Sequence, residues 1–336
     1  MSKKKVTVIS CAFNEEDCVE ELGRRLAAMF DSLPDYDFEA ILVDNGSVDQ
    51  TLARAQALAA SDARFHIVEL SRNFGFDSGL AAGLPLAAGD AVVFMAADLQ
   101  DPPEVIPQFI EKWEQGYENV YGFVAKRHGT SWLRRLNSRL FYSVIGRLAD
   151  HPIPPNARDF RLIDRRVYRQ LLAMNEKIWF LRGLVAWTGF RSIGVEFDQA
   201  PRFGGSSKAA SFQIIEFAIK AIFAHSLAPL RVMPVLGVTL TAGSFFALIG
   251  LALNSLVAGV PFPGFGTIVA VILLLFGILF CLLSVIGIYV GLIFEQARGR
   301  PSFVVRNIYG PSVLAEENDG DGITTTAHVE RSADPV

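Results

Sequence analysis

Short apolar runs alternate with amphipathic stretches over the first third of the chain. Short runs bounded by turn residues are typical of strands, and an apolar spacing of three or four residues is typical of helices. Regular alternation of the two predicts an α/β fold with a doubly wound, mostly parallel sheet. The predicted strands are Val6–Ser10, Phe38–Val43, Phe65–Leu70, Ala91–Met95 and Asn119–Val124, and the predicted helices are Asp17–Phe30, Thr51–Ala60, Gly79–Ala87 and Glu104–Glu114.

A different pattern occupies the C-terminal third, where no Asp, Glu, Lys, Arg or His occurs from Val232 to Phe294. A membrane span needs about 20 apolar residues. We therefore predict two transmembrane helices, Val232–Val257 and Thr267–Phe294, joined by an uncharged turn over 258–266. A buried helical hairpin of a soluble protein would carry some charge over such a length.

Basic residues flank the uncharged stretch on both sides, and the turn has none. Arg231 precedes the first span, and Arg298, Arg300 and Arg306 follow the second. The positive-inside rule places both flanks, and the α/β domain with them, in the cytoplasm. Upstream, Ser211–Leu227 gathers its apolar residues on one helical face, which is typical of a helix lying in the membrane interface. Packing of this helix against the α/β domain is the alternative, and both contacts can coexist.

These patterns divide the chain into four parts. We expect an α/β domain over 1–210, an amphipathic juxtamembrane helix over 211–230, a transmembrane hairpin over 231–295 and a cytoplasmic tail over 296–336. The tail beyond residue 311 is acidic, rich in Thr and without periodicity, which predicts disorder.

Composition narrows the class of protein. The chain has 336 residues and a formal net charge of −4, which argues against a nucleic-acid-binding protein. Cys11, Cys18 and Cys281 are too few for a disulfide framework and fit a reducing compartment. The apolar stretch that follows Met1–Lys5 is too short for a signal peptide. Neither a dinucleotide fingerprint nor a P-loop motif follows any predicted strand.

Candidate ligand-binding residues follow the end of the fourth predicted strand, in the segment Ala97–Glu104. Pro102 and Pro103 forbid continuation of the strand, so Asp98 and Gln100 lie at the sheet edge where open α/β sheets bind ligands. Carboxylate and amide oxygens suit a hard divalent cation that also holds a diphosphate. The alternative is an ordinary polar loop that opens the next helix.

The ends of the first two strands are also polar. The second strand leads into Asp44, whose carboxylate can accept hydrogen bonds from a nucleobase imide or a ribose hydroxyl. Asn45 and Gly46 then predict a tight turn. Ser47 or Asp49 can cap the following helix, and capping is the better interpretation for Asp49.

Four motifs, F-N-E-E, V-D-N-G-S-V-D-Q-T, L-S-R-N-F-G and A-D-L-Q-D-P-P-E, follow one another in this order. Together they resemble the GT-A glycosyltransferases of family 2, and more closely the polyprenyl-phosphate glycosyltransferases. That group contains dolichol-phosphate mannose synthase and the bactoprenol glucosyltransferases. The later motifs that extend the resemblance are Arg134-x-x-x-Ser138, Asp159–Leu162, Phe180–Leu184 and Arg202-x-x-Gly205-x-Ser207-Lys208, followed by the two predicted spans.

The resemblance implies roles for individual residues. Phe13, Glu15 and Asp44 would line the nucleoside pocket, although the family usually has Tyr at the position of Phe13. Asp98 and Gln100 would bind Mg²⁺ or Mn²⁺ and the donor diphosphate. The family often has a further Asp two residues earlier, where this chain has Ala. Either the two remaining residues suffice with the diphosphate oxygens, as relatives on the bactoprenol side suggest, or metal binding is weakened.

The acceptor implied by the resemblance is a lipid phosphate, which carries about −1.5 to −2 charge and needs cations near the membrane surface. In the family, the Asp that matches Asp159 of this chain lies at the reaction centre. Because a phosphate oxygen is already nucleophilic near neutral pH, Asp159 would orient groups or balance arginines rather than act as a strong base. The candidate phosphate ligands are Arg127, Arg134, Ser138, Arg202, Ser207 and Lys208, and each arginine can alternatively be a solvated residue or contact anionic headgroups.

The sequence therefore predicts an inverting hexosyl transfer from a nucleotide sugar, with UDP-glucose as the expected donor, to undecaprenyl or another polyprenyl phosphate. The expected location is the cytoplasmic face of a bacterial inner membrane, in the pathway of a cell-envelope glycan. GDP-mannose or another UDP-sugar, and a non-catalytic scaffold, are the alternatives. A processive polysaccharide synthase is disfavoured because the chain lacks a Q-x-x-R-W motif. We expect a homo-oligomer and no nucleic-acid partner.

Overall fold

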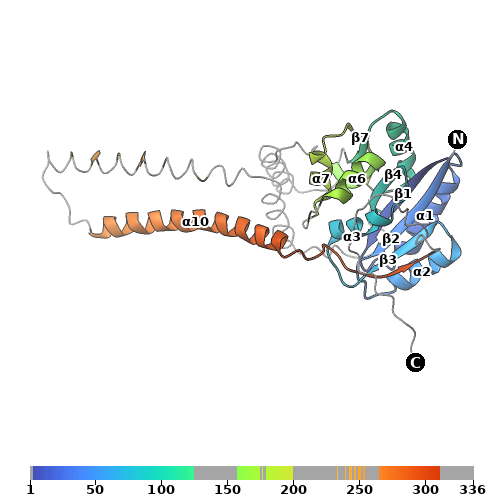
Figure 1. Cartoon of the computed structure of the whole chain (residues 1–336), viewed down its shortest axis with the longest axis horizontal. Helices are drawn as coiled ribbons and strands as arrows, with labels where there is room; N and C mark the ends of the chain where they lie inside the picture. The colour runs from blue at the N-terminus through green and yellow to red at the C-terminus, as the bar shows by residue number, and fades with distance from the viewer. Residues whose placement is uncertain are drawn as a thin grey trace, which may run out of the picture.

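The computed structural model of the protein describes residues 3–124, 157–174, 176, 179–199 and 265–310, with isolated helical positions between 233 and 253. The described strands form one sheet in the order β7-β5-β6-β4-β1-β2-β3-β8 (Figure 1). They are β1 (Lys4–Ala12), β2 (Tyr36–Asp44), β3 (Phe65–Leu70), β4 (Ala91–Ala96), β5 (Asn119–Phe123), β6 (Ala157–Asp164), β7 (Ser192–Glu196) and β8 (Val305–Tyr309).

The centre of the sheet is parallel, as predicted. β1 pairs with β2 and β4, and β2 pairs with β3, all in parallel register. These four strands therefore end at the same edge, where Ala12 lies beside Asp44 and Asp44 lies beside Glu69. β5 and β7 are also parallel, whereas β6 runs antiparallel to β4 and β5, and β8 runs antiparallel to β3.

Helices cover both faces, because neighbouring residues of a strand point to opposite sides. Val8 of β1 faces a core formed with α1 and α4, while Ile9 faces a core formed with α3, α6 and α7. The described helices are α1 (Val19–Asp31), α2 (Thr51–Ser61), α3 (Phe76–Gly83), α4 (Ile106–Glu114), α6 (Arg165–Ala173), α7 (Leu181–Trp187) and α10 (Phe265–Ala297).

Two predicted helices differ from the structure at their ends. The helix predicted over Gly79–Ala87 begins at Phe76 and ends at Gly83, where a 3₁₀ turn follows over Leu84–Leu86. Pro85 explains the early end, because it has no N–H for the helical ladder. The helix predicted from Glu104 likewise starts as a 3₁₀ turn over Pro103–Val105 before α4 begins.

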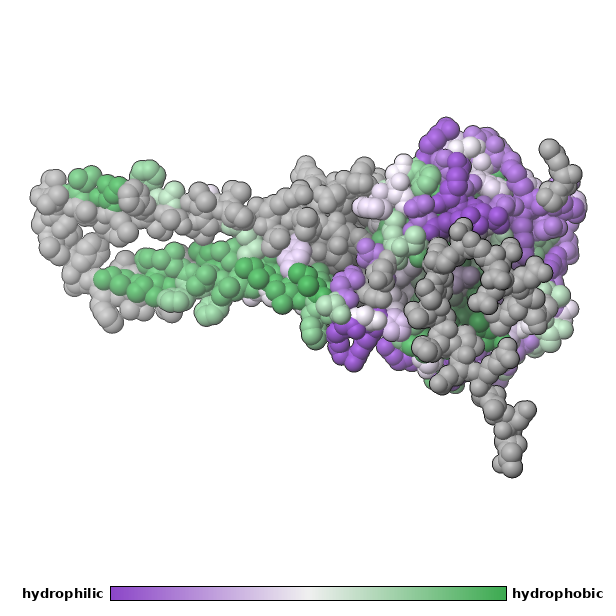
Figure 2. Space-filling view, in the orientation of Figure 1, coloured by the Kyte–Doolittle hydropathy of each residue, from purple (hydrophilic) through white to green (hydrophobic). Residues whose placement is uncertain are grey.

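The long helix α10 leaves the α/β domain on the side where α3 and α7 lie (Figure 1). Its segment Leu275–Phe294 is long and apolar enough to cross a membrane, and none of it is buried against the protein. Figure 2 shows this exposed apolar surface along the helix. Among the described residues this is the one such helix, and it contains the predicted span Thr267–Phe294. The other predicted span, Val232–Val257, lies outside them except at isolated positions, as does all of Ser211–Leu227.

Beyond α10 the chain returns to the sheet, which was not predicted. Residues 298–304 connect the helix to β8, and β8 then adds a strand to the free edge of β3. Val305 pairs with Leu70, the last residue of β3, so the connection enters at the edge where the parallel strands end. The apolar helix is thereby attached beside that edge.

Candidate active site

The loops after β1 and β2 support each other at the edge of the sheet. Asn14 has a left-handed backbone, with φ of 53°, and its N–H donates to Ser47 Oγ at 3.0 Å. The N–H of Glu15 donates to Thr51 Oγ1 at 2.8 Å. These bonds place Phe13 and Glu15, two of the residues predicted to bind the nucleoside, next to the loop that follows Asp44.

Asp44 is the last residue of β2 and is only 3% exposed. Its Oδ2 accepts a hydrogen bond from the N–H of Ser47 at 3.2 Å, while Oδ1 has no hydrogen-bond partner among the residues that the structure describes. Burial raises the pKa of Asp44, and the charge of Glu69 on the neighbouring strand adds to the effect. A buried carboxylate oxygen left unpaired in a loop site is suited to accept a hydrogen bond from a ligand.

Asn45 and Gly46 connect this site to the loop after β3. Asn45 Oδ1 accepts from the N–H of Phe74, and Asn45 Nδ2 donates to the carbonyl oxygen of Gly75, both at 2.9 Å. Gly46 has φ of 73°, and a Cβ there would lie 2.5 Å from the carbonyl carbon of Arg72. The sequence predicted the turn, but the close approach of the two loops became visible only in the fold. Asp49 accepts from the N–H of Thr51 at 3.0 Å, but the N-cap of α2 is Gln50, which makes no side-chain capping bond, so Asp49 lies one residue before the capping position.

The loop after β4 holds Asp98 and Gln100 together at the same edge. Leu99 between them is buried with a left-handed backbone, φ of 60°, so both flanking side chains remain half-buried. The N–H of Gln100 donates to Asp98 Oδ1 at 3.2 Å, and Gln199 Nε2 donates to Gln100 Oε1 at 2.8 Å. The predicted pair is therefore preorganised by the backbone and by a side chain that follows β7.

Asp101 was not predicted as part of the site, although it closes this loop. Its Oδ2 accepts from the N–H of Ala96 at 3.3 Å, and its Oδ1 lies 3.4 Å from Arg158 Nε. Burial raises the pKa of Asp101 to about 6. The carboxylate thus holds the loop through Oδ2 and the ion pair with Arg158, while Oδ1 makes no hydrogen bond within the described residues. Ala96 leaves no carboxylate at the position where the family often has one.

The donor set at this edge fits a hard divalent cation that is shared with a substrate. Asp98 and Gln100 offer carboxylate and amide oxygens. Across the described ranges, no group of three or more His, Cys, Asp or Glu side chains gathers to hold an ion alone. Mg²⁺ is commonly held in proteins by one or two carboxylates together with waters and substrate phosphates. The residues present therefore fit Mg²⁺ or Mn²⁺ if the diphosphate provides further ligands.

Asp159, near the start of β6, is fully paired. Arg182 of α7 donates to both of its oxygens, Nε to Oδ1 at 2.9 Å and Nη2 to Oδ2 at 3.0 Å. Asp77 of α3 lies close by, and its Oδ1 accepts from the N–H of Leu181 at 3.1 Å. The site thus joins α3, β6 and α7, and the planar fork of Arg182 fixes the orientation of Asp159.

Sequence reasoning missed Asp77 of this cluster, and it gave Arg161, which stands in the motif Asp159–Leu162, no role. Burial, together with the charge of Asp159, raises the pKa of Asp77. Burial lowers the pKa of Arg161 to about 10, and its Nε has no hydrogen-bond partner in the described part of the chain. An Asp in the first turn of a helix is ordinarily explained by the helix dipole, so Asp77 gave no separate signal. Arg182 did stand in a recognised motif, but without an assigned role.

The predicted ligands of the lipid phosphate cannot be placed in this site. They all lie outside the described residues and stay predictions. These residues are Arg127, Arg134, Ser138, Arg202, Ser207 and Lys208.

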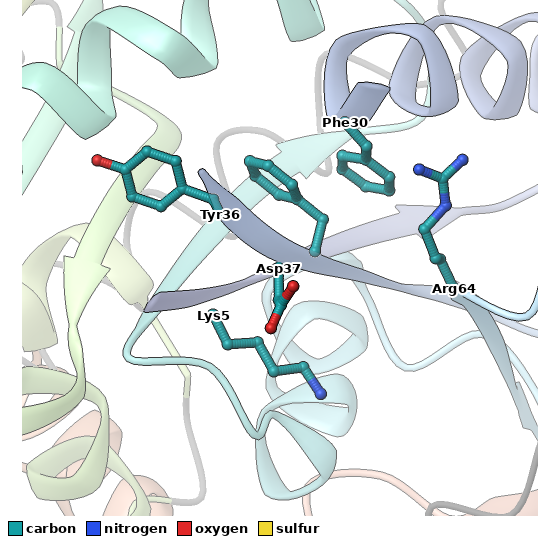
Figure 3. A pocket seen from close by; sticks show the side chains of 6 residues that line it. Lys5, Phe30, Tyr36, Asp37 and Arg64 are labelled. Carbon is teal, nitrogen blue, oxygen red and sulfur yellow. The ribbon is translucent and has the colours of Figure 1, made fainter. Parts of the chain in front are cut away.

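A pocket of about 460 Å³ opens at the opposite edge of the sheet, where β1 and β2 begin (Figure 3). Its cations are already neutralised. Lys5 pairs with Glu39, and Arg64 binds Asp31 and Asp62, each at 2.7 Å. This pocket therefore has no cation available for a phosphate. The candidate site residues Asp44, Asp98 and Asp159 lie at the other edge.

The family model and the curated relatives agree on one family. The family model described as Glycosyl transferase family 2 matches residues 7–172. An uncharacterized glycosyltransferase of Synechocystis is 38% identical over 93% of this chain and 98% of its own length. The bactoprenol glucosyl transferase of Shigella phage SfV is 32% identical over 90% of this chain and 98% of its own. Glucosyl-3-phosphoglycerate synthase from Mycobacterium tuberculosis, solved with Mn²⁺, UDP-glucose and phosphoglyceric acid, is 19% identical with a TM-score of 0.44, covering 67% of this chain and 79% of that one.

Proposed function

Since this chain belongs to glycosyl transferase family 2 and is a glycosyltransferase, we propose that it transfers a sugar from a nucleotide sugar to a polyprenyl phosphate at a membrane surface. The observation that carries the proposal is the unpaired, buried oxygen of Asp44. It lies at the same sheet edge as Asp98, and the apolar helix α10 is attached beside that edge.

The donor site is formed by the loops after β1, β2 and β4. Asp44 accepts a hydrogen bond from the nucleoside, flanked by Phe13 and Glu15. UDP-glucose is the proposed donor, because relatives that span almost the whole chain are named bactoprenol glucosyl transferases. GDP-mannose or another UDP-sugar, as an alternative donor, would bind in the same site.

Asp98 and Gln100 are the residues that would hold Mg²⁺ or Mn²⁺ at this edge. When bound, such an ion supplies positive charge that stabilises a departing diphosphate. The residues of the chain contribute positioning, because the N–H of Gln100 and the side chain of Gln199 hold the pair in place. Asp101 and Arg158 keep the loop closed beneath them.

The transfer itself is a single displacement. A phosphate oxygen of the lipid forms a bond to the anomeric carbon while the bond from that carbon to the diphosphate oxygen breaks, and attack from the opposite face inverts the configuration. No proton has to be removed, because the phosphate is already ionised near neutral pH. Asp159, held by both donors of Arg182, orients the groups around the reacting centre.

The attachment of α10 supports an acceptor that resides in a membrane. Residues 298–304 can span at most about 25 Å between α10 and β8, and β8 begins at the end of β3. The edge that carries Asp44 and Asp98 therefore lies near the membrane surface when α10 is inserted. We propose the two-helix topology, with the catalytic domain and the C-terminus in the cytoplasm of a bacterium. Confining both reactants to this surface raises their effective concentration.

A donor screen tests the proposal. Purified full-length protein in detergent is incubated with undecaprenyl phosphate, Mg²⁺ or Mn²⁺ and a panel of nucleotide sugars, and mass spectrometry detects the glycolipid. We expect one preferred donor and loss of product with EDTA. Asp98→Asn should lower product formation by about 10²-fold or more with the fold intact. Asp35→Asn, at an exposed position before β2, is the matched control.

The possible outcomes separate an enzyme from a scaffold. If no donor gives product and the protein also fails to bind nucleotides, the chain is a non-catalytic relative. If nucleotide binding is intact but no product forms, the proposed acceptor is wrong.

A further inference from the structure

The side chain of Glu69 on β3 is only 8% exposed, and its hydrogen bonds come from the strand that follows the apolar helix. Arg306 Nη1 donates to Oε1 at 3.0 Å. Asn307 Nδ2 and Tyr309 OH donate to Oε2 at 2.9 Å and 2.8 Å. A register shift between Glu69 and Leu70 accompanies this arrangement. The C-terminal strand thus stabilises a buried carboxylate on the central sheet.

Glu69 stands directly beside Asp44. The two are partners in the parallel register of β2 and β3, and Glu69 is in turn the partner of Asn307 in the antiparallel register of β3 and β8. Partners on neighbouring strands point to the same face of a sheet. Two carboxylates therefore lie side by side, and the cation of Arg306 is on the far side of the pair from Asp44.

The pKa values of the two carboxylates depend on this row, in which Asp44, Glu69 and Arg306 lie on three neighbouring strands. Burial opposes ionisation of Glu69, but the hydrogen bonds from Asn307, Tyr309 and Arg306 outweigh burial and lower its pKa. Burial raises the pKa of Asp44, and Glu69 contributes to the increase. Cys11 on β1 interacts with Asp44 from the other side, and its buried thiol, with the pKa raised to about 12, stays neutral. Burial is the main cause of the raised pKa of Asp44, hydrogen bonds from Ser47 oppose it, and the charge of Glu69 adds to it.

A second route connects β8 to the same site. The N–H of Ser71 donates to the carbonyl oxygen of Val304 at 3.0 Å, and Arg306 Nη2 donates to the carbonyl oxygen of Ser71 at 3.1 Å. Ser71 begins the loop after β3, in which the N–H of Phe74 donates to Asn45. The docking of β8 thus holds the loop that packs against the turn following Asp44.

We propose that β8 is a positioning element of the donor site: Arg306, with Asn307 and Tyr309, balances Glu69 so that Asp44 can bind the nucleoside. This inference rests on the proposed function, in which Asp44 contacts the donor. Because β8 is connected to α10 only by residues 298–304, donor binding becomes coupled to the correct placement of the membrane helix. Arg306 is a positioning residue, since it acts through Glu69 and does not touch the substrate.

The test is UDP binding by the full-length protein in detergent with Mn²⁺, measured by calorimetry over a pH series that begins just above 3.8, the ordinary pKa of an aspartate, and ends at about pH 8.5. Arg306→Gln leaves Glu69 without its cation, which favours protonation of Asp44. We expect UDP affinity to fall about tenfold for a pKa increase of one unit, at a pH below that pKa, and to recover as pH rises. In turnover assays the donor KM should increase while kcat changes little.

Three further variants exclude a purely structural effect. Arg306→Lys keeps the charge and should bind UDP like the wild type. Arg300→Gln removes the same charge from an exposed residue that does not contact Glu69, and should also leave binding unchanged. Adding Glu69→Gln to the Arg306→Gln variant removes the uncompensated carboxylate and should restore affinity. If Arg306→Gln does not fold, Tyr309→Phe removes one hydrogen bond and should give a smaller defect of the same pH dependence.

The outcomes distinguish this inference from the proposed function. A wild-type protein that binds no nucleotide contradicts the proposed function. Unchanged UDP affinity in Arg306→Gln contradicts the role of β8 alone, and so does a defect that is independent of pH and persists in the double variant.

Discussion

Asp44 and Asp159 lie at the same end of the sheet but differ in how many of their carboxylate oxygens are hydrogen-bonded. One oxygen of Asp44 lacks a partner in the described structure, whereas both oxygens of Asp159 are bound by Arg182. An unpaired buried oxygen is free to bind a ligand, and a doubly bonded one is suited to orient other groups. The sequence predicted both residues, because each stands at the end of a strand or in a recognised motif. It did not predict Arg182 as the partner, since the two residues belong to separate elements.

Asp77→Asn should make the protein more stable at neutral pH. Burial raises the pKa of Asp77, so the folded protein binds this proton more tightly than the unfolded chain does. The stability of the wild type therefore falls as pH rises from the ordinary value of 3.8 through the raised pKa. Asn can still accept from the N–H of Leu181, and we expect a gain of about 1 kcal/mol above that window.

Thermal melting in detergent at several pH values measures this effect. The exposed Asp37→Asn variant is the control and should melt like the wild type at each pH. A constant difference between Asp77→Asn and the wild type across the pH range would contradict the prediction.

At the scale of elements, the first five strands were predicted well, because each is a short apolar run with clear boundaries, whereas β6, β7 and β8 were not among the predicted strands. The strand β3 was predicted with the correct ends, and β1, β2 and β4 with small differences. The helices were less accurate at their ends, as the early stop before Pro85 shows. The candidate site depends on loops between these elements. Their mutual contacts, such as Asn45 with Phe74, have no signal in local periodicity.

Gly46→Ala tests the contact between two of these loops. The left-handed backbone at Gly46 disfavours any Cβ by roughly 1–2 kcal/mol, and the new methyl group would lie 2.5 Å from the backbone of Arg72. We expect the free energy of unfolding to fall by at least about 2 kcal/mol, with weaker nucleotide binding.

Gly116→Ala is a matched control for this variant. Gly116 also has a positive φ, 89°, but its Cβ would meet nothing closer than Arg191 Nη1 at 3.7 Å, far from the site in the turn after α4. It should reduce stability by only about 1 kcal/mol and leave nucleotide binding unchanged. Equal effects of the two substitutions would show that the loop contact is unimportant.

At the scale of the whole molecule, the apolar helix α10 is connected to the edge of the sheet through β8. α10 exposes its apolar side chains along its length, and the chain then returns to pair with β3 (Figures 1 and 2). A helix of this kind is stable only if lipid or another apolar surface covers it. The strand β8 attaches this helix beside the edge that carries Asp44 and Asp98, and in the proposed function a soluble donor and a lipid acceptor meet there.

A charge in the middle of α10 should prevent stable insertion. Leu283 is 49% exposed on the helix surface, and Leu283→Arg should disfavour insertion by about 2.5–3.5 kcal/mol. The measurement is the fraction of full-length protein that remains in membranes after alkaline extraction. Leu283→Ala should remain membrane-bound. Equal retention of the Arg and Ala variants would mean that α10 does not contact the hydrocarbon core.

Local chemistry along the chain was sufficient to predict the parallel sheet, the end of β2 at Asp44, the polar loop at Asp98 and the apolar segment Thr267–Phe294. These features are determined by neighbouring residues, through periodicity, turn residues and hydropathy. The bond from Arg182 to Asp159, and the row of Asp44, Glu69 and Arg306, required the folded chain. Residues 69 and 306 are separated by the whole apolar region, and only the pairing of β8 with β3 brings opposite charges together in a buried place.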